Sequence, residues 1–222
     1  MNDAALRLFS GSLSMFGAKA EIALREKGFE FDLVMVPFRT AYEPKHPEVL
    51  RVNPKRQVPV LIHGDLEIFD STQIFEYLED LKPEPALWPR EAGARARARL
   101  LELKSDEVYF PHIIRLMGLQ HDLAGADAAA ARAGAAAYHQ QIEVLLADRD
   151  YLAGDFSFAD IAFFMAQLFG ERLGAPLDDS MPRLAAWRSR MTGRASVRAV
   201  VKPMAAFLAA NGGFVPAFMR DL

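Results

Sequence analysis

The sequence contains no cysteine among its 222 residues. A disulfide, a zinc–thiolate site and a cysteine nucleophile are therefore excluded, because each of them needs a thiol. Long hydrophobic runs are also missing, since none approaches the roughly 20 residues that span a bilayer. The first residues, MNDAALRLFSGSLS, lack the basic start and long apolar stretch of a signal peptide. We therefore expect a cytoplasmic protein with no membrane partner.

An excess of charge of one sign is absent as well. The 26 lysines and arginines are scattered among 29 aspartates and glutamates, and the net charge is −3. Proteins that bind nucleic acid or anionic membranes usually carry a basic patch, so we expect neither partner here. The histidines show no metal-ligand spacing. We therefore expect no metal.

The most informative stretch is RQVPVLIHGDLEIFDST, from residue 56 to residue 72. Two short apolar runs flank a Gly-Asp pair, which predicts a β-hairpin with a tight turn. Pro59 stands at the head of the first run, where it removes a hydrogen-bond donor from the ladder. A cis bond before Pro59 would accommodate this and would turn the backbone of Val58 outward. We predict that this backbone pairs with a peptide-like ligand.

A polar pair, Asp70-Ser71, follows the hairpin and begins a helical pattern that runs to Leu81. The N-terminus of a helix favours a carboxylate, and Ser71 can donate a hydrogen bond to one. The carboxylate of Asp70 can accept from an ammonium group. An amino-acid head group carries both charges, so we predict that a small peptide binds with its free α-amino-acid end at this pair.

The remaining pattern divides the chain into two domains. A strand at 6–10, a helix at 15–28, a strand at 31–36, a proline-rich loop with one helical turn, the hairpin and the helix at 71–81 make an α/β domain over residues 1–81. Residues 82–89, KPEPALWP, are typical of a linker. Residues 90–222 contain only helical patterns, including 92–117, 125–147 and a helix that begins with a capping box, Ser157-x-x-Asp160.

The order of elements in residues 1–81 resembles the thioredoxin fold, which normally performs thiol chemistry with cysteines of its own. The whole chain resembles a cytosolic glutathione transferase. Three stretches carry this resemblance: LRLFSGSLSMFGAKAEIALREKG, NPKRQVPVLIHGDLEIFDSTQIFEYLED and YLAGDFSFADIAFF. It implies a thioredoxin-like glutathione-binding domain, an all-helical domain, glutathione as the co-substrate, and a homodimer.

In such families the residue that opens the first helix is Tyr, Ser or Cys. The first tyrosine here is Tyr42, which comes too late, so the resemblance implies a serine-type enzyme with Ser10, Ser12 or Ser14 as candidates. Counting back from IAL at residues 22–24 favours Ser14, and Ser12 is the main alternative. The Ser14 hydroxyl would donate to the sulfur of glutathione and favour its thiolate; it would not act as a nucleophile.

The resemblance also assigns the two binding regions. The glutathione-binding residues would be Gln57, Val58, Pro59, Asp70 and Ser71. Gln57 stands where the family often has lysine, so Lys45 or His46 could supply the missing cation. The second substrate would lie between the domains, and the tail at 214–219 could cover it. Its pocket would be lined by Met15, Phe16, Tyr109, Phe110, Ile113 and Met117.

The implied function is transfer of glutathione to a small apolar electrophile, as in detoxification. The alternative is a non-catalytic glutathione-binding or regulatory protein with the same fold. The unusual GSLSM stretch and Gln57 leave this alternative open, and turnover of an aryl halide would separate the two.

Overall fold

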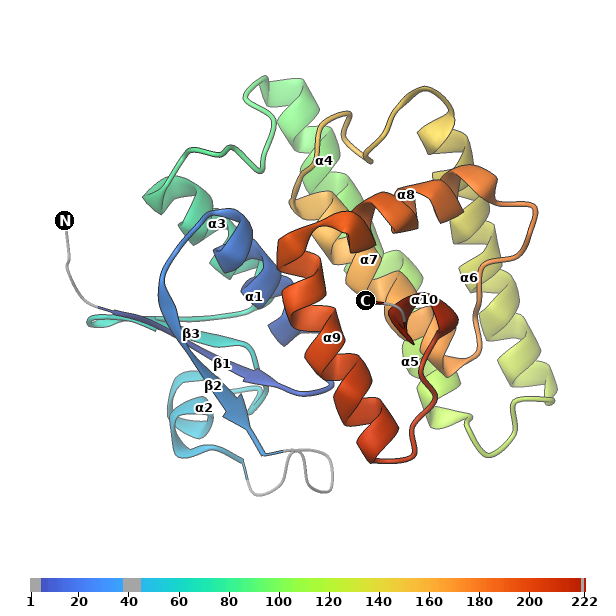
Figure 1. Cartoon of the computed structure of the whole chain (residues 1–222), viewed down its shortest axis with the longest axis horizontal. Helices are drawn as coiled ribbons and strands as arrows, with labels where there is room; N and C mark the ends of the chain where they lie inside the picture. Colours follow the sequence, from blue (N-terminus) through green and yellow to red (C-terminus); the bar gives the residue numbers. More distant parts are fainter. Residues whose placement is uncertain (1–4, 38–44, 221) are drawn as a thin grey trace.

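The computed structural model describes residues 5–37, 45–220 and 222. Two units lie side by side, with a small β-sheet and its helices on the left and a bundle of helices on the right (Figure 1). The fold class expected from the sequence, a thioredoxin-like domain followed by an all-helical one, is confirmed. The boundaries 1–81, 82–89 and 90–222 stay a prediction.

The sheet has four strands in the order β2-β1-β3-β4. The strands are β1 (Leu6–Gly11), β2 (Phe31–Val36), β3 (Val60–His63) and β4 (Leu66–Phe69). Helix α1 (Met15–Glu26) makes the crossover between β1 and β2, which are parallel, whereas β3 is antiparallel to both of its neighbours. The predicted hairpin is thus β3-β4.

Helices cover both faces of the sheet, and because side chains alternate along a strand, consecutive residues pack on opposite faces. Leu8 and Leu61, which are paired in register, belong to the core shared with α1 and α3 (Ser71–Leu81). Their neighbours Phe9 and Val60 pack on the opposite face with Val49 of the short helix α2 (Pro47–Val52). The site is built where these layers meet the helical unit.

The helical unit contains no β-strand among the residues described. The long helical pattern expected over 92–117 is interrupted, because a π-helical turn (Ser105–Tyr109) separates α4 (Ala92–Lys104) from α5 (Phe110–Gly118). The remaining helices are α6 (Ala126–Leu145), a 3₁₀ turn (Leu146–Asp148), α7 (Phe158–Leu173), α8 (Pro182–Gly193), α9 (Ala195–Ala210) and α10 (Ala217–Arg220).

Helix α7 forms the centre of this unit, and nearly all of its residues are buried. It packs against α4 and α5 and also against α1 of the other unit. The predicted capping box at its start is present. The Asp160 carboxylate accepts from the Ser157 amide (3.0 Å), the Leu152 amide (2.9 Å) and the Trp187 indole (2.8 Å), so it also anchors the preceding loop and α8.

One apolar core continues from the sheet unit into the helical unit. Phe75 of α3 stacks on Phe158 of α7, with ring centroids 4.4 Å apart, and Trp88 from the connecting segment lies 4.9 Å from Phe158. The connecting segment is held in place by Glu79, which accepts hydrogen bonds from the amides of Leu87 and Trp88 (each 3.1 Å). The two units are therefore packed as one body.

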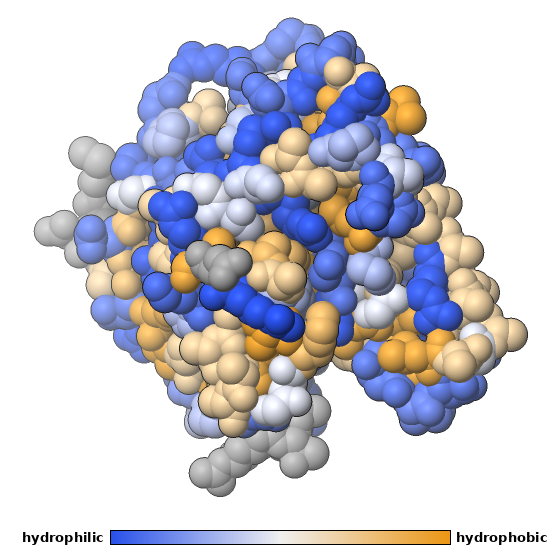
Figure 2. All heavy atoms as spheres, turned by 45° about the vertical axis from the view of Figure 1, so that its right-hand side comes forward, coloured by the Kyte–Doolittle hydropathy of each residue, from blue (hydrophilic) through white to orange (hydrophobic). Residues whose placement is uncertain are grey.

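The surface is mixed: on the face drawn in Figure 2, hydrophilic and hydrophobic side chains are interspersed, and a notch opens at the lower edge. Within the described chain, no helix combines the length and the apolar character that crossing a membrane requires.

Candidate functional site

The loop before β3 shapes the sheet side of the site. The Val58–Pro59 peptide bond is cis, as the sequence predicts. Asn53, which is buried, fixes the turn that leads into it: its side-chain amide donates to the Gln57 carbonyl (2.6 Å), and its side-chain oxygen accepts from the Lys55 amide (2.9 Å). Sequence reasoning missed this role, although the Asn-Pro pair at 53–54 is a recognisable turn signal.

A first cavity of about 360 Å³ lies between this loop, the start of α3 and the helical unit. It brings together all five residues predicted to bind glutathione: Gln57, Val58, Pro59, Asp70 and Ser71. It is also lined by residues that sequence reasoning did not assign: Asn53, Lys55, Phe69, Thr72, Gln73, Glu102, Leu103, Asp106 and Glu107.

Asp70 has an unusual backbone, with φ of 78°, in the left-handed region that few residues other than glycine, asparagine and aspartate adopt. It caps α3: its Oδ1 accepts from the amides of Thr72 (3.0 Å) and Gln73 (3.3 Å). Ser71 is buried beside it at the first helical position. A carboxylate and a hydroxyl thus meet at the positive end of a helix dipole, an environment that suits a zwitterionic head group.

The wall opposite this pair is acidic and comes from the helical unit. Lys19 of α1 is fully buried behind it, and its Nζ lies 3.1 Å from Glu102 Oε1 and 2.6 Å from Asp106 Oδ2. The Thr72 hydroxyl donates to the same oxygen of Glu102 (2.8 Å). Burial raises the pKa of Asp106 to about 6. This network links the start of α3 to the helical unit, and nothing local in the sequence indicates it.

Ser14 is the N-cap of α1, where its Oγ accepts from the Gly17 amide (3.0 Å). A hydroxyl that accepts one hydrogen bond still has its proton to donate. Gly17 is required at this position, because a Cβ there would come within 2.2 Å of the Ser10 Oγ. Ser12 lines a different cavity, of about 170 Å³, beside α9. The two candidate serines therefore lie in separate environments.

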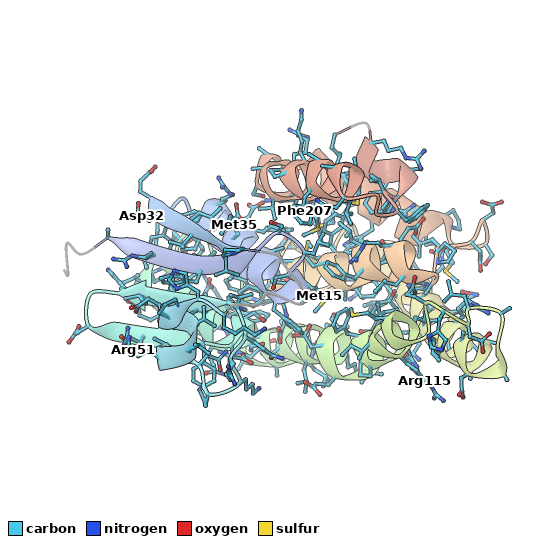
Figure 3. All side chains as sticks on the ribbon, turned by 90° about the horizontal axis from the view of Figure 1, so that it is seen from below. Met15, Asp32, Met35, Arg51, Arg115 and Phe207 are labelled. Atoms are coloured by element: carbon cyan, nitrogen blue, oxygen red, sulfur yellow. The ribbon has the colours of Figure 1, made fainter. Side chains whose placement is uncertain are left out.

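Ser14 lines a second cavity of about 530 Å³, which shares Phe16, Gln57 and Val58 with the first. Met15, Phe16, Phe110 and Met117, all expected in the acceptor pocket, line it. Met15 lies between the two units in Figure 3. The other lining residues are Leu13, Val36, Val49 and Phe169, which are apolar, and Lys45, His46, Arg56 and Arg172, which are basic.

Two of the expected pocket residues are core residues instead. Tyr109 is fully buried, its hydroxyl lies 2.9 Å from Nε2 of His139, and its ring packs edge-on against Phe163. Ile113 is also fully buried, and neither residue lines the two cavities. Their apolar stripe faces α6 and α7, whereas Phe110 and Met117 lie on the neighbouring stripe that faces the second cavity.

The tail at 214–219 does not cover the pocket. Phe218 packs against Phe164 of α7 (ring centroids 6.4 Å apart) and under the guanidinium of Arg188, and Met219 is buried. No residue from 214 to 219 lines either cavity. Across residues 5–37, 45–220 and 222, no cluster of three or more histidine, aspartate or glutamate side chains is placed to hold a metal.

Comparison with known proteins places the site in context. Residues 4–80 match the model of the glutathione S-transferase N-terminal domain, and residues 107–195 match that of the C-terminal domain. The chain is 31% identical to a probable glutathione S-transferase, GSTF1, of Oryza sativa subsp. japonica, over 90% of this chain and 97% of that one. A shorter match, 33% identical, covers 47% of this chain and 48% of a stringent starvation protein A homolog of Coxiella burnetii.

A solved structure described as glutathione S-transferase I bound with the ligand lactoylglutathione superposes with a TM-score of 0.75. It is 26% identical, and the match covers 89% of this chain and 98% of that one.

Proposed function

Because the chain belongs to the glutathione S-transferase family, we propose that it is a glutathione transferase in which Ser14 stabilises the thiolate of bound glutathione. The observation that carries this proposal is the place of the Ser14 hydroxyl. It stands at the N-terminus of α1 in a cavity that joins the first one at Val58.

In this proposal glutathione occupies the first cavity. Its γ-glutamyl head group lies at Asp70 and Ser71, where a carboxylate and a helix N-terminus offer opposite charges. Its cysteinyl backbone pairs with Val58, which follows the ordered loop and precedes the cis bond. The sulfur then lies near the junction of the cavities, within reach of Ser14.

A free thiol titrates near pH 8.5, and a hydrogen-bond donor and a helix N-terminus both lower that value. A drop of about two pKa units would be worth about 2.7 kcal/mol and would make the thiolate dominant at neutral pH. The thiolate attacks an electrophilic carbon in the second cavity. A C–S bond forms, and a leaving group such as chloride departs with its bonding electron pair. The apolar walls of that cavity suit an apolar acceptor.

The test is the pH titration of bound glutathione, followed by thiolate absorbance, in the wild type, in Ser14→Ala and in Ser12→Ala. We expect the wild type and Ser12→Ala to lower the thiol pKa and Ser14→Ala to restore it towards the free value. Ser12 is the matched control because it lines the cavity beside α9. An unshifted thiol pKa in the wild type would refute the role of Ser14.

A second candidate function is a non-catalytic glutathione-binding or regulatory protein. The match over about half the chain to a protein named as a stringent starvation protein A homolog favours it. Turnover of 1-chloro-2,4-dinitrobenzene with glutathione separates the two functions. A rate no greater than the uncatalysed one, together with intact glutathione binding, would favour the non-catalytic protein.

We also propose that the protein is a cytoplasmic homodimer that serves detoxification. Large apolar side chains are exposed on β4, on α4 and on the π-helical turn: Leu66, Leu100, Leu103 and Val108, each between 41% and 51% exposed. Their burial against a second copy would remove this surface from water. Sedimentation velocity measures the state directly, and a monomer would contradict the proposal.

A further inference from the structure

The sulfur atoms of the protein differ sharply in their exposure. The chain has nine methionines and no cysteine, so all of its sulfur is in methionine. Of the methionines that the structure describes, Met35 and Met117 are each 45% exposed. The others are buried, and none is more than 4% exposed: Met15, Met165, Met181, Met191, Met204 and Met219. Among the described methionines, only Met35 and Met117 are therefore open to a reagent in solution.

The two exposed methionines line different cavities. Met117 lies near the end of α5 and lines the second cavity, of about 530 Å³, together with the apolar side chains of Phe110 and Phe169. Met35 belongs to β2, at the edge of the sheet, and lines the cavity of about 170 Å³ beside α9 (Figure 3). One exposed thioether thus lies in the proposed acceptor site, and the other offers a comparison at equal exposure.

The chemical state of the Met117 sulfur affects what this cavity can bind. A thioether suits an apolar ligand, because it is polarizable and accepts hydrogen bonds only weakly. A sulfoxide is polar, and the water that hydrates it must be displaced when a ligand fills the cavity. An apolar acceptor offers the sulfoxide oxygen no hydrogen bond in return. Oxidation should therefore weaken binding of the acceptor and spare glutathione, since Met117 does not line the first cavity.

We infer that Met117 is a redox modification site that controls the acceptor cavity, with an apolar organic hydroperoxide as the oxidant. The sulfur attacks the terminal oxygen of the hydroperoxide, an S–O bond forms, and the O–O bond breaks. The sulfur gives up two electrons and becomes a sulfoxide, while the other oxygen takes the proton and leaves as the alcohol. Methionine sulfoxide reductases reverse this oxidation. The effect on transfer rests on the proposed function, because only then does the second cavity hold the acceptor.

The experiment treats the protein with cumene hydroperoxide in the absence of glutathione, removes the reagent and locates the sulfoxides by peptide mass spectrometry. The KM for 1-chloro-2,4-dinitrobenzene and the glutathione affinity by calorimetry are then measured on the same sample. We expect oxidation at Met117 and Met35 but not at Met15, which lines the second cavity and is 2% exposed. The KM should rise about tenfold, equivalent to about 1.4 kcal/mol, at unchanged glutathione affinity.

Two matched variants assign the effect to one sulfur. Leucine is close to methionine in volume and contains no sulfur, so we choose Met117→Leu and Met35→Leu. Treatment should leave the KM of Met117→Leu at its own untreated value, whereas Met35→Leu should show the same rise as the wild type. Incubation of the oxidised wild type with methionine sulfoxide reductases should restore its KM.

The outcomes separate this inference from the proposed function. An unmodified Met117 in a sample whose Met35 is oxidised would overturn the inference. A Met117 sulfoxide with an unchanged KM, or an equal rise in treated Met117→Leu, would also overturn it, and the transferase activity would stand. If the untreated protein shows no turnover, the proposed function fails and the control of the acceptor cavity fails with it.

Discussion

Replacing Lys19 with methionine should strongly destabilise the protein. Lys19 is fully buried between α1 and the helical unit, and it is the cation that faces both Glu102 and Asp106. Removing one partner of a buried ion pair typically costs 3–5 kcal/mol, because the other charge stays buried without compensation. We expect a loss near the lower end, about 3 kcal/mol, because the Asp106 side chain keeps 12% of its surface exposed.

The same reasoning predicts a pH dependence for Lys19→Met. Burial already raises the pKa of Asp106 to about 6, and Lys19 opposes that rise. Without Lys19 the folded-state pKa of Asp106 rises further above its unfolded value of about 3.9. A raised carboxyl pKa makes stability fall as pH increases through the interval between the two values. The destabilisation should therefore be larger at about pH 8 than at about pH 6.

The assay is urea unfolding of the wild type, of Lys19→Met and of the triple variant Lys19→Met/Glu102→Gln/Asp106→Asn. The triple variant buries no net charge and should recover most of the lost free energy of unfolding. A loss below about 1 kcal/mol in Lys19→Met, or a triple variant no more stable than the single one, would refute this account of the network.

Three further predictions test other parts of the molecule. Burial lowers the pKa of His139 to about 4, whereas the value in the unfolded chain is about 6.5. The free energy of unfolding of the wild type should therefore fall by about 3 kcal/mol as pH drops through that interval, and urea unfolding of His139→Gln should not show this fall. The same pH dependence of the unfolding free energy in both proteins would contradict the prediction. Asp70→Asn keeps the helix cap and the tolerance for a positive φ but removes the negative charge. Calorimetry should therefore show that the variant binds glutathione about tenfold more weakly, at unchanged stability. An unchanged affinity would contradict the assignment of Asp70 to the head group. Ser157→Ala should cost about 1 kcal/mol in urea unfolding as a lost N-cap, and a loss within error would argue against the cap.

The sheet unit and its ligand-facing loop could be predicted because their signals are local. A Gly-Asp turn between two apolar runs indicates a hairpin, a proline at its head indicates an altered backbone, and Asp70-Ser71 before a helical pattern indicates a cap. Each of these signals depends only on residues that are neighbours in the chain, so a single sequence is enough to recognise it.

The acceptor side was harder to predict because two adjacent stripes of side chains, which run along the end of the π-helical turn and α5, are both apolar. Tyr109 and Ile113 form one stripe, Phe110 and Met117 form the next, and periodicity alone does not tell a core stripe from a pocket stripe. The π-helical turn before Phe110 adds to this, since it changes the rotation between α4 and α5 from the regular helical value.

Contacts between distant segments could not be predicted at all. Lys19 meets Asp106 across 87 positions of sequence, and Arg172 lines the same cavity as Val58. Such pairs depend on how the two units pack against each other, and no local sequence pattern indicates that packing.

The segment that joins the two units has a consequence for how a ligand enters. Besides Leu87 and Trp88, Glu79 binds the fully buried Lys27 (2.6 Å), which also donates to the Pro85 carbonyl (2.8 Å). The connecting segment is thus held by several buried polar contacts and is not expected to act as a hinge. Buried polar contacts of this kind oppose movement of one unit against the other. We therefore expect the cleft to be largely preformed before a ligand enters, which lowers the free-energy cost of ordering the site on binding.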